Sequence, residues 1–172
     1  MPSKKPARNL MTAALIKALE GMRKGSGGPF GALIAKDGKI IAQCHNEVLA
    51  TNDPTAHAEI VTIRKACRKL RTVHLDGCEL YTSCEPCPMC LGAAYWARIE
   101  RIVYANTRKD AEAIGFGDRF IYRELAKPLT KRKLPMVPYM RKEALAAFKH
   151  WQARSEKIHY GPSSRAKRPF KA

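Results

Sequence analysis

Two short motifs constrain this chain more than any other feature: His57-Ala58-Glu59 and Pro86-Cys87-Pro88-Met89-Cys90. Histidine nitrogen and cysteine sulfur are typical zinc ligands, and a catalytic zinc site has three protein ligands and a fourth position open for water. His57, Cys87 and Cys90 supply three such ligands. Glu59 lies beside the histidine as a carboxylate that need not bind metal. The two motifs together therefore predict a zinc site that performs hydrolysis.

The spacing inside each motif indicates where the site lies on its helices. Cys87 and Cys90 are three positions apart, so at the start of a helix their side chains lie on one face. His57 and Glu59 are only two apart, so they can serve one pocket only if it lies beyond the helix N-terminus, toward which side chains lean. A helix N-terminus also favours thiolate over thiol. We therefore expect the ligands at helix N-termini.

Each motif alone has an ordinary explanation. A His-x-Glu pair is common by chance, and a Cys-x-x-Cys pair occurs in redox sites and in structural zinc ribbons. The combination is the signature of zinc deaminases, in which the glutamate is not a ligand but a general acid and base. Two thiolates also cancel the charge of the zinc ion, so the metal acidifies its water less than a three-histidine site would. A general base is then needed, and Glu59 is placed to be one.

Length and composition favour a single cytoplasmic domain. The 172 residues are enough for one core, and six cysteines without a secretory signal read as reduced thiols. No apolar run is long enough for a membrane span. The net charge of +17 would suit binding to nucleic acid. Most of the excess positive charge, however, lies at the two ends of the chain, because residues 1–24 and 149–172 hold 13 of the 32 basic side chains and only two of the 15 acidic ones. We therefore expect at most weak, non-specific binding of nucleic acid.

The order of the predicted elements is typical of an α/β fold. We expect helices at about 9–24, 56–70, 88–97 and 142–151, and strands at about 30–36, 39–44, 79–83 and 102–105. Asn9 and Thr55 are good N-caps for the first two helices, and Asp37-Gly38 is a hairpin turn. Residues 127–138 form a connector with a short strand at Met136-Val137. The alternation favours a mostly parallel sheet with helices on both faces and the site at strand ends.

The paired motifs resemble those of the cytidine/deoxycytidylate deaminase superfamily, which implies a three-layer α/β/α sandwich with a mixed five-stranded sheet. Longer runs resemble bacterial guanine deaminases, at residues 28–31, 52–59, 81–90, 95–98 and 115–122. This likeness covers residues 9–160 as a zinc-dependent deaminase domain, between a basic disordered leader at 1–8 and a basic extension at 161–172. It implies one Zn²⁺ per subunit, conversion of guanine to xanthine and ammonia, and a homodimer with a swapped C-terminal segment.

The resemblance also implies a guanine pocket. Phe30 and the His57 ring would stack on the purine, with Trp96 at its edge. Asn46 would donate to O6, and Asp118 would accept from N1–H and the 2-amino group. A phenylalanine at a strand start is as often an ordinary core residue, and an aspartate in a Gly-rich turn is usually a turn former.

Two further residues complete the expected pocket. Ala58, between the ligand histidine and Glu59, counts among the substrate-binding residues. Tyr160 matches the family's C-terminal tyrosine and would close over the bound purine. A tyrosine near a polar terminus is otherwise a surface residue without a function.

Other functions remain open at this point. A tRNA adenosine deaminase shares both zinc motifs, as does a cytosine deaminase, and guanosine or an aminotriazine such as ammeline would be additional substrates of a guanine deaminase. A tRNA enzyme needs a basic surface at the site mouth, whereas the residues around Asn46 and Asp118 are rather acidic. From a different class, a non-catalytic zinc module with basic tails would need a fourth protein ligand. The sources would be His45, His74, His150, His159 or Cys84.

Overall fold

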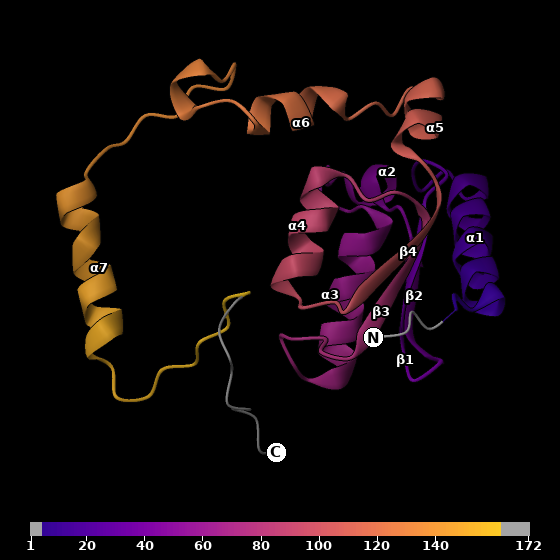
Figure 1. The fold of residues 1–172 in the computed structure, drawn as a ribbon, viewed down its shortest axis with the longest axis horizontal. Coiled ribbons are helices and arrows are strands. Elements are labelled where there is room, and N and C mark those ends of the chain that lie inside the picture. Colours follow the sequence, from indigo (N-terminus) through magenta and orange to yellow (C-terminus); the bar gives the residue numbers. More distant parts are fainter. Residues whose placement is uncertain (1–4, 163–172) are drawn as a thin grey trace. The chain divides into compact units, whose positions relative to one another are not determined.

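The computed structural model describes residues 5–162, which fall into two compact units, residues 5–118 and 119–162 (Figure 1). The predicted extension at 161–172 therefore lies almost wholly outside the described residues. The first unit contains a four-stranded sheet in the order β2-β1-β3-β4. Its strands are β1 (Gly31–Lys36), β2 (Lys39–His45), β3 (Cys78–Cys84) and β4 (Arg101–Asn106).

The sheet is mixed, as expected, but it is neither five-stranded nor mostly parallel within the described residues. Strand β1 runs antiparallel to both β2 and β3, and only β3 and β4 are parallel. Asp37 and Gly38 both have positive φ, at 50° and 75°, which is the geometry of a tight antiparallel hairpin. Met136-Val137 forms no strand. Pro135 and Pro138 flank it and lack the N–H donors that a strand ladder requires.

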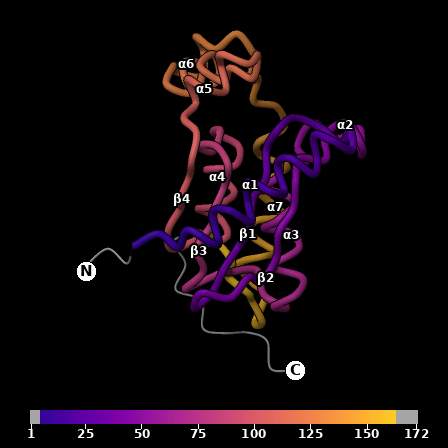
Figure 2. The backbone as a smooth tube through the Cα atoms, turned by 90° about the vertical axis from the view of Figure 1, so that its right-hand side faces the viewer, coloured from indigo at the N-terminus to yellow at the C-terminus, as the bar shows by residue number. Residues whose placement is uncertain are grey.

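Helices cover both faces of this sheet (Figures 1 and 2). Helix α1 (Arg8–Arg23) packs on one face, and α3 (Ala58–Leu70) and α4 (Pro88–Trp96) lie on the other. Alternate strand residues serve the two faces: Leu33 and Tyr81 pack with Leu10 of α1, whereas Ile34 and Leu80 pack with α3. This period-two division of the strands is what produces the predicted three layers.

Two predicted helix starts are wrong. Helix α1 is preceded by Ala7 as its N-cap rather than by Asn9, which lies inside the first turn. Helix α3 begins at Ala58 with His57 as its N-cap. Thr55 does not cap it, because its N–H and hydroxyl both donate to Asp53 Oδ1 at 2.7 Å. These bonds fix an Asx turn that delays the helix start.

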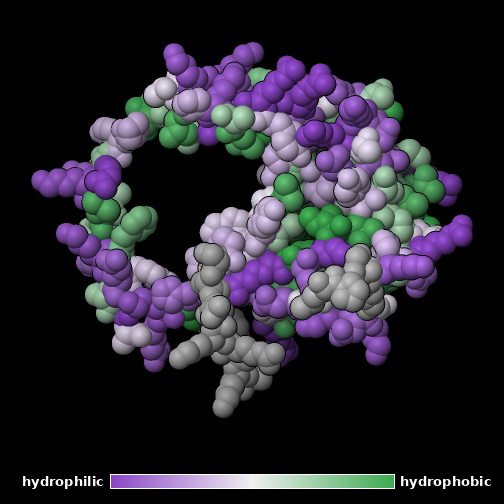
Figure 3. Space-filling view, viewed as in Figure 1, coloured by the Kyte–Doolittle hydropathy of each residue, from purple (hydrophilic) through white to green (hydrophobic). Residues whose placement is uncertain are grey.

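The remaining helices are short, except for the last one, which was expected at 142–151 and is confirmed. Helix α2 (Val48–Thr51) follows β2, and α5 (Arg108–Ala113) is the last helix of the first unit. The second unit comprises α6 (Arg119–Leu125), the 3₁₀ turn η1 (Leu129–Lys131) and α7 (Arg141–Ala153). Hydrophobic side chains are visible on the surface of these segments (Figure 3). Among the described residues, every helix is too short or too polar to cross a membrane.

Candidate metal centre and active site

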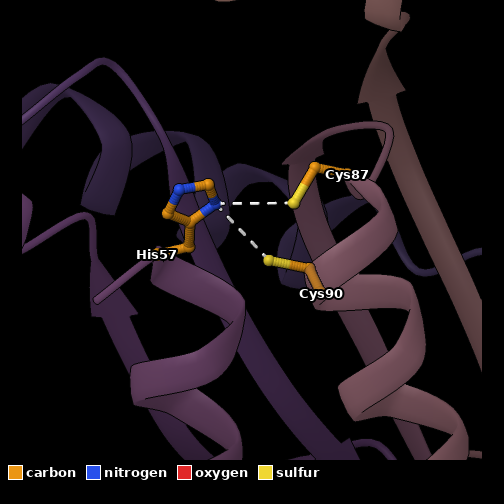
Figure 4. A group of neighbouring side chains, drawn as sticks. All are labelled: His57, Cys87 and Cys90. Carbon is orange, nitrogen blue, oxygen red and sulfur yellow. Dashed lines mark hydrogen bonds between the residues drawn. The ribbon is translucent and has the colours of Figure 1, made fainter. Parts of the chain in front are cut away.

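Three side chains of the first unit converge on one point: His57, Cys87 and Cys90 (Figure 4). The Nδ1 atom of His57 lies 3.6 Å from Cys87 Sγ and 3.5 Å from Cys90 Sγ. A tetrahedral zinc ion, with bonds of about 2.3 Å to sulfur and about 2.0 Å to nitrogen, would separate those atoms by about 3.5 Å. Both nitrogen–sulfur spacings therefore fit a zinc ion, and all three ligand atoms lie within 4.8 Å of one another.

Two helix N-termini position these residues. His57 and Cys87 are the N-caps of α3 and α4, and both have extended backbones, with ψ of 152° and 168°. Pro88 occupies the first turn of α4, where its missing N–H costs nothing. Cys90 is the third residue of α4 and is fully buried. The partial positive charge of both helix ends is thus directed at the two sulfur atoms.

The ionisation of the two thiols also fits a divalent cation. The pKa of Cys87 is lowered to about 4, chiefly because the Cys90 thiol donates to it and also because His57 lies beside it. The pKa of Cys90 is raised, first by its hydrogen bond to Cys87 and then by burial. One thiolate therefore opposes the formation of the second. A cation held between the two sulfur atoms removes that repulsion.

Glu59 lies in the first turn of α3 and is 6% exposed. Burial raises the pKa of its carboxyl group. Its Oε1 accepts a hydrogen bond from the hydroxyl of Thr82 on β3, at 3.2 Å. Thr82 was not predicted as a site residue, although it lies in the run 81–83 that leads into the cysteine motif. The carboxylate is therefore held in place and can carry a proton.

Asn46 is buried directly after β2. Its backbone N–H donates to Phe30 O at 2.9 Å, and its Oδ1 accepts from Val48 N–H at 3.1 Å. Gly27 approaches so closely that a Cβ there would lie 2.0 Å from Asn46 Oδ1. Because its amide oxygen is engaged in this turn, Asn46 offers its NH₂ group as a donor.

An aromatic pair lies at the start of β1. The ring of Phe30 meets the ring of Phe116 edge to face, with centroids 5.0 Å apart and planes at 90°. Phe116 was missed in the sequence, where it lies in the run 115–118 beside Asp118. Partial burial, and then the negative charge at Cys87, raise the pKa of the Asp118 carboxyl group. Asp118 is thus close enough to the metal centre for their charges to interact.

Three predicted residues remain: Ala58, which follows the ligand His57 directly, Trp96 at the far end of α4, and Tyr160 in the second unit. Ala58 is fully buried as the first residue of α3. Trp96 is exposed at the end of α4, about 13 Å along the helix axis from Cys87. Tyr160 is exposed and belongs to the second unit. Binding roles for these three residues stay predictions.

Comparisons with known proteins agree with this site. The family model of the cytidine and deoxycytidylate deaminase zinc-binding region matches residues 4–106. The chain is 52% identical over 147 residues to guanine deaminase of Bacillus subtilis, covering 86% of this chain and 94% of that one. The solved structure of that Bacillus subtilis protein has a TM-score of 0.87 at 49% identity, over 91% and 99% of the two chains. A tRNA-specific adenosine deaminase of Aquifex aeolicus is 46% identical over 99 residues, 58% of this chain and 65% of that one.

Proposed function

The chain belongs to the cytidine and deoxycytidylate deaminase family, and on that premise we propose that it hydrolyses guanine to xanthine and ammonia in purine catabolism. The observation that carries this proposal is a three-ligand cluster with a buried carboxylate beside it. Three ligands leave a fourth position for water, whereas a structural zinc site is closed by four protein ligands. The likeness to guanine deaminase over 86% of the chain supports guanine as the substrate.

His57, Cys87 and Cys90 would hold one Zn²⁺ per subunit. When bound, zinc supplies a Lewis acid that lowers the pKa of water and so yields a nucleophile near neutral pH. Glu59 accepts a proton from the attacking water on its carboxylate and delivers it to a ring nitrogen of the purine. It then carries a proton to the departing amine. Burial suits this work, because a carboxyl group with a raised pKa holds and releases a proton near neutral pH.

Two polar groups would select guanine. The NH₂ group of Asn46 donates to O6, and the Asp118 carboxylate accepts from N1–H and the 2-amino group. Adenine presents an amine in place of O6, so it would face the Asn46 NH₂ group with a donor rather than an acceptor. Such a mismatch rejects a ligand strongly when the protein groups are buried. The Phe30 and His57 rings would stack on the purine faces.

The direct test is an ammonia-release assay on the zinc-loaded protein with guanine, guanosine, ammeline, cytosine, adenine and a tRNA anticodon stem. We expect guanine to be the preferred substrate. Equal or faster deamination of adenosine in the tRNA stem, or of cytosine, would refute the assignment. Glu59→Gln should keep its zinc and lose several orders of magnitude in turnover. Glu100→Gln, an exposed carboxylate outside the site, is the matched control.

The assembly we propose is a cytoplasmic homodimer in which the second unit of one subunit closes the site of the other. The second unit supports this idea because it leaves many large apolar side chains exposed: Phe120, Leu125, Leu134, Val137, Tyr139, Phe148 and Tyr160. Apolar surface of this extent usually marks an interface. Tyr160 would then exclude water from the purine.

Truncation and subunit mixing test this assembly. A chain that ends after Tyr160 should keep its turnover, whereas one that ends before Lys157 should lose turnover but keep its zinc. Mixing a Glu59→Ala chain with the shorter chain should restore activity, because the first donates its C-terminal segment to the intact site of the second. Full activity of the shorter chain alone, or a monomer in light scattering, would contradict the proposal.

A further inference from the structure

A second reactive cluster lies outside the metal centre and consists of Cys44, Glu47 and Lys65. Cys44 is in β2 and only 4% exposed, Glu47 precedes α2, and Lys65 is in α3. Lys65 Nζ is 2.9 Å from Cys44 Sγ and 3.4 Å from Glu47 Oε1. Cys44 Sγ donates to the same carboxylate oxygen at 3.0 Å. The mechanism proposed for guanine uses none of these three side chains.

The contact between nitrogen and sulfur is short. A separation of 2.9 Å is ordinary for nitrogen and oxygen, but sulfur is a larger atom, and the nitrogen–sulfur contacts at the metal centre are 3.5 and 3.6 Å. The packing around the cluster holds the pair in place, because Cys44 belongs to a buried group with Ala56 and Val61. The two atoms thus face each other at about the separation that one bridging oxygen atom spans.

The hydrogen bonds of the cluster fix the protonation states of its three side chains. Burial, and then the hydrogen bond to Glu47, raise the pKa of the Cys44 thiol. The pKa of Lys65 is raised by its hydrogen bond to Cys44. The pKa of Glu47 is lowered, chiefly because the Cys44 thiol donates to it. The cluster therefore holds a protonated thiol, an ammonium group and a carboxylate, and the first two are the starting groups of an oxidation that joins sulfur to nitrogen.

We propose that Cys44 and Lys65 form an oxidative modification site, in which one oxygen atom joins Sγ to Nζ as an S–O–N bridge. Dioxygen is the oxidant: one thiol, one ammonium group and one O₂ give the bridge, one water and one proton. The S–H bond, two N–H bonds and the O–O bond break, and the S–O bond, the O–N bond and the two O–H bonds of the water form. Sulfur and nitrogen each lose two electrons, and the two oxygen atoms take up the four. The released proton passes to solvent water, which reaches the pair because the Lys65 side chain is 44% exposed.

The position of the bridge makes it an oxidation-sensitive link between two parts of the fold. It would join β2, two residues before Asn46, to the helix that begins beside His57. The Lys65 side chain is 44% exposed, which gives dioxygen and thiol reductants a route to the pair. Thiols would reduce the bridge back to cysteine and lysine. The bridge involves only this cluster and does not depend on the substrate of the metal centre.

Mass spectrometry of the full zinc-loaded chain tests the bridge. Protein purified under nitrogen with a thiol reductant is divided, and one half is exposed to air-saturated buffer. We expect the aerobic half to gain one oxygen and lose two hydrogens, and its tryptic peptide containing Cys44 to be joined to the one containing Lys65. The aerobic protein should also melt at a higher temperature, and reductant should reverse both changes, because a cross-link restricts the unfolded chain.

Three variants make the result decisive. Lys65→Arg keeps the positive charge beside Glu47 but replaces the amine, so it should fold normally and form no bridge, as should Cys44→Ser. Cys67→Ser removes a different cysteine, which lies in α3, and should leave the bridge intact. A gain of oxygen without loss of hydrogen, which is a sulfenic acid, would overturn the proposal. So would a loss of two hydrogens without oxygen, which is a disulfide or an S–N bond, or an unchanged aerobic mass.

Discussion

Replacing Thr82 with valine should slow deamination without weakening substrate binding. The Thr82 hydroxyl donates to Glu59 Oε1 at 3.2 Å, and Thr82 is 1% exposed. Valine has nearly the same shape, so the change removes the hydrogen bond and creates no cavity. The Glu59 carboxylate would then lose a donor that fixes its orientation toward the metal centre.

The size of the effect follows from the kind of hydrogen bond. A hydrogen bond to a charged group contributes about 1.5–3 kcal/mol, and about 1.4 kcal/mol corresponds to a factor of ten in rate. If the whole contribution is expressed in the transition state, kcat for guanine falls about 10- to 150-fold. KM should change little, because Thr82 touches the proton-carrying group and not the purine.

Steady-state kinetics with guanine, together with zinc content and melting temperature, provide the assay. Thr82→Ser keeps the hydroxyl and should restore most of the turnover. Thr62→Val is the matched control, because Thr62 is an equally buried threonine whose hydroxyl donates to backbone carbonyls instead. It should lower stability but leave kcat unchanged. A wild-type kcat for Thr82→Val, or a loss of activity that lies entirely in KM, would refute this role of Thr82.

Three other changes have clear expected results. Removing the metal with a chelator should lower the melting temperature, since binding energy at His57, Cys87 and Cys90 adds to folding energy; an unchanged melting curve would contradict the metal centre. Gly27→Ala should cost about 1–3 kcal/mol of stability, measured by denaturant unfolding, because its Cβ would lie 2.0 Å from Asn46 Oδ1. Thr107 donates to the Asp110 carboxyl group and lowers its pKa. The stability that this carboxylate adds to the folded protein is therefore present above the unfolded-state pKa of about 3.9 and is lost as pH falls through the folded pKa. Melting temperatures of Asp110→Asn should therefore fall less steeply in acid than those of the wild type.

Local chemistry made parts of the fold predictable. Asp37-Gly38 indicated the β1–β2 hairpin, because few residue pairs adopt positive φ at two successive positions. Pro88 indicated the start of α4, because proline suits the first turn of a helix. The convergence of His57 with the two cysteines followed from ligand chemistry. In each case the residues that decide the structure are close together in the sequence.

What the sequence did not reveal depends on contacts between distant residues. The direction of β1 relative to β3 is set by pairing across about 50 positions, such as Ala32 with Thr82, and no local pattern encodes it. Alternation of helices and strands suggested a parallel sheet instead. Likewise, the bond from Thr82 to Glu59 joins positions 23 apart. The start of α3 was misplaced because Thr55 looks like an N-cap, yet its hydroxyl is used by Asp53.

The two metal-centre helices begin without the side chains that would best stabilise them. His57 and Cys87 occupy N-cap positions, and neither makes a capping hydrogen bond. A serine or aspartate at such a position typically adds about 1 kcal/mol to the free energy of unfolding. The two helices together therefore lack about 2 kcal/mol of stabilisation, whereas an ordinary domain has a total stability of about 5–15 kcal/mol. In the absence of metal, His57→Asp and Cys87→Ser should therefore fold more stably than the wild type. In a lineage that no longer needed the reaction, selection for stability alone would favour changes at these two positions.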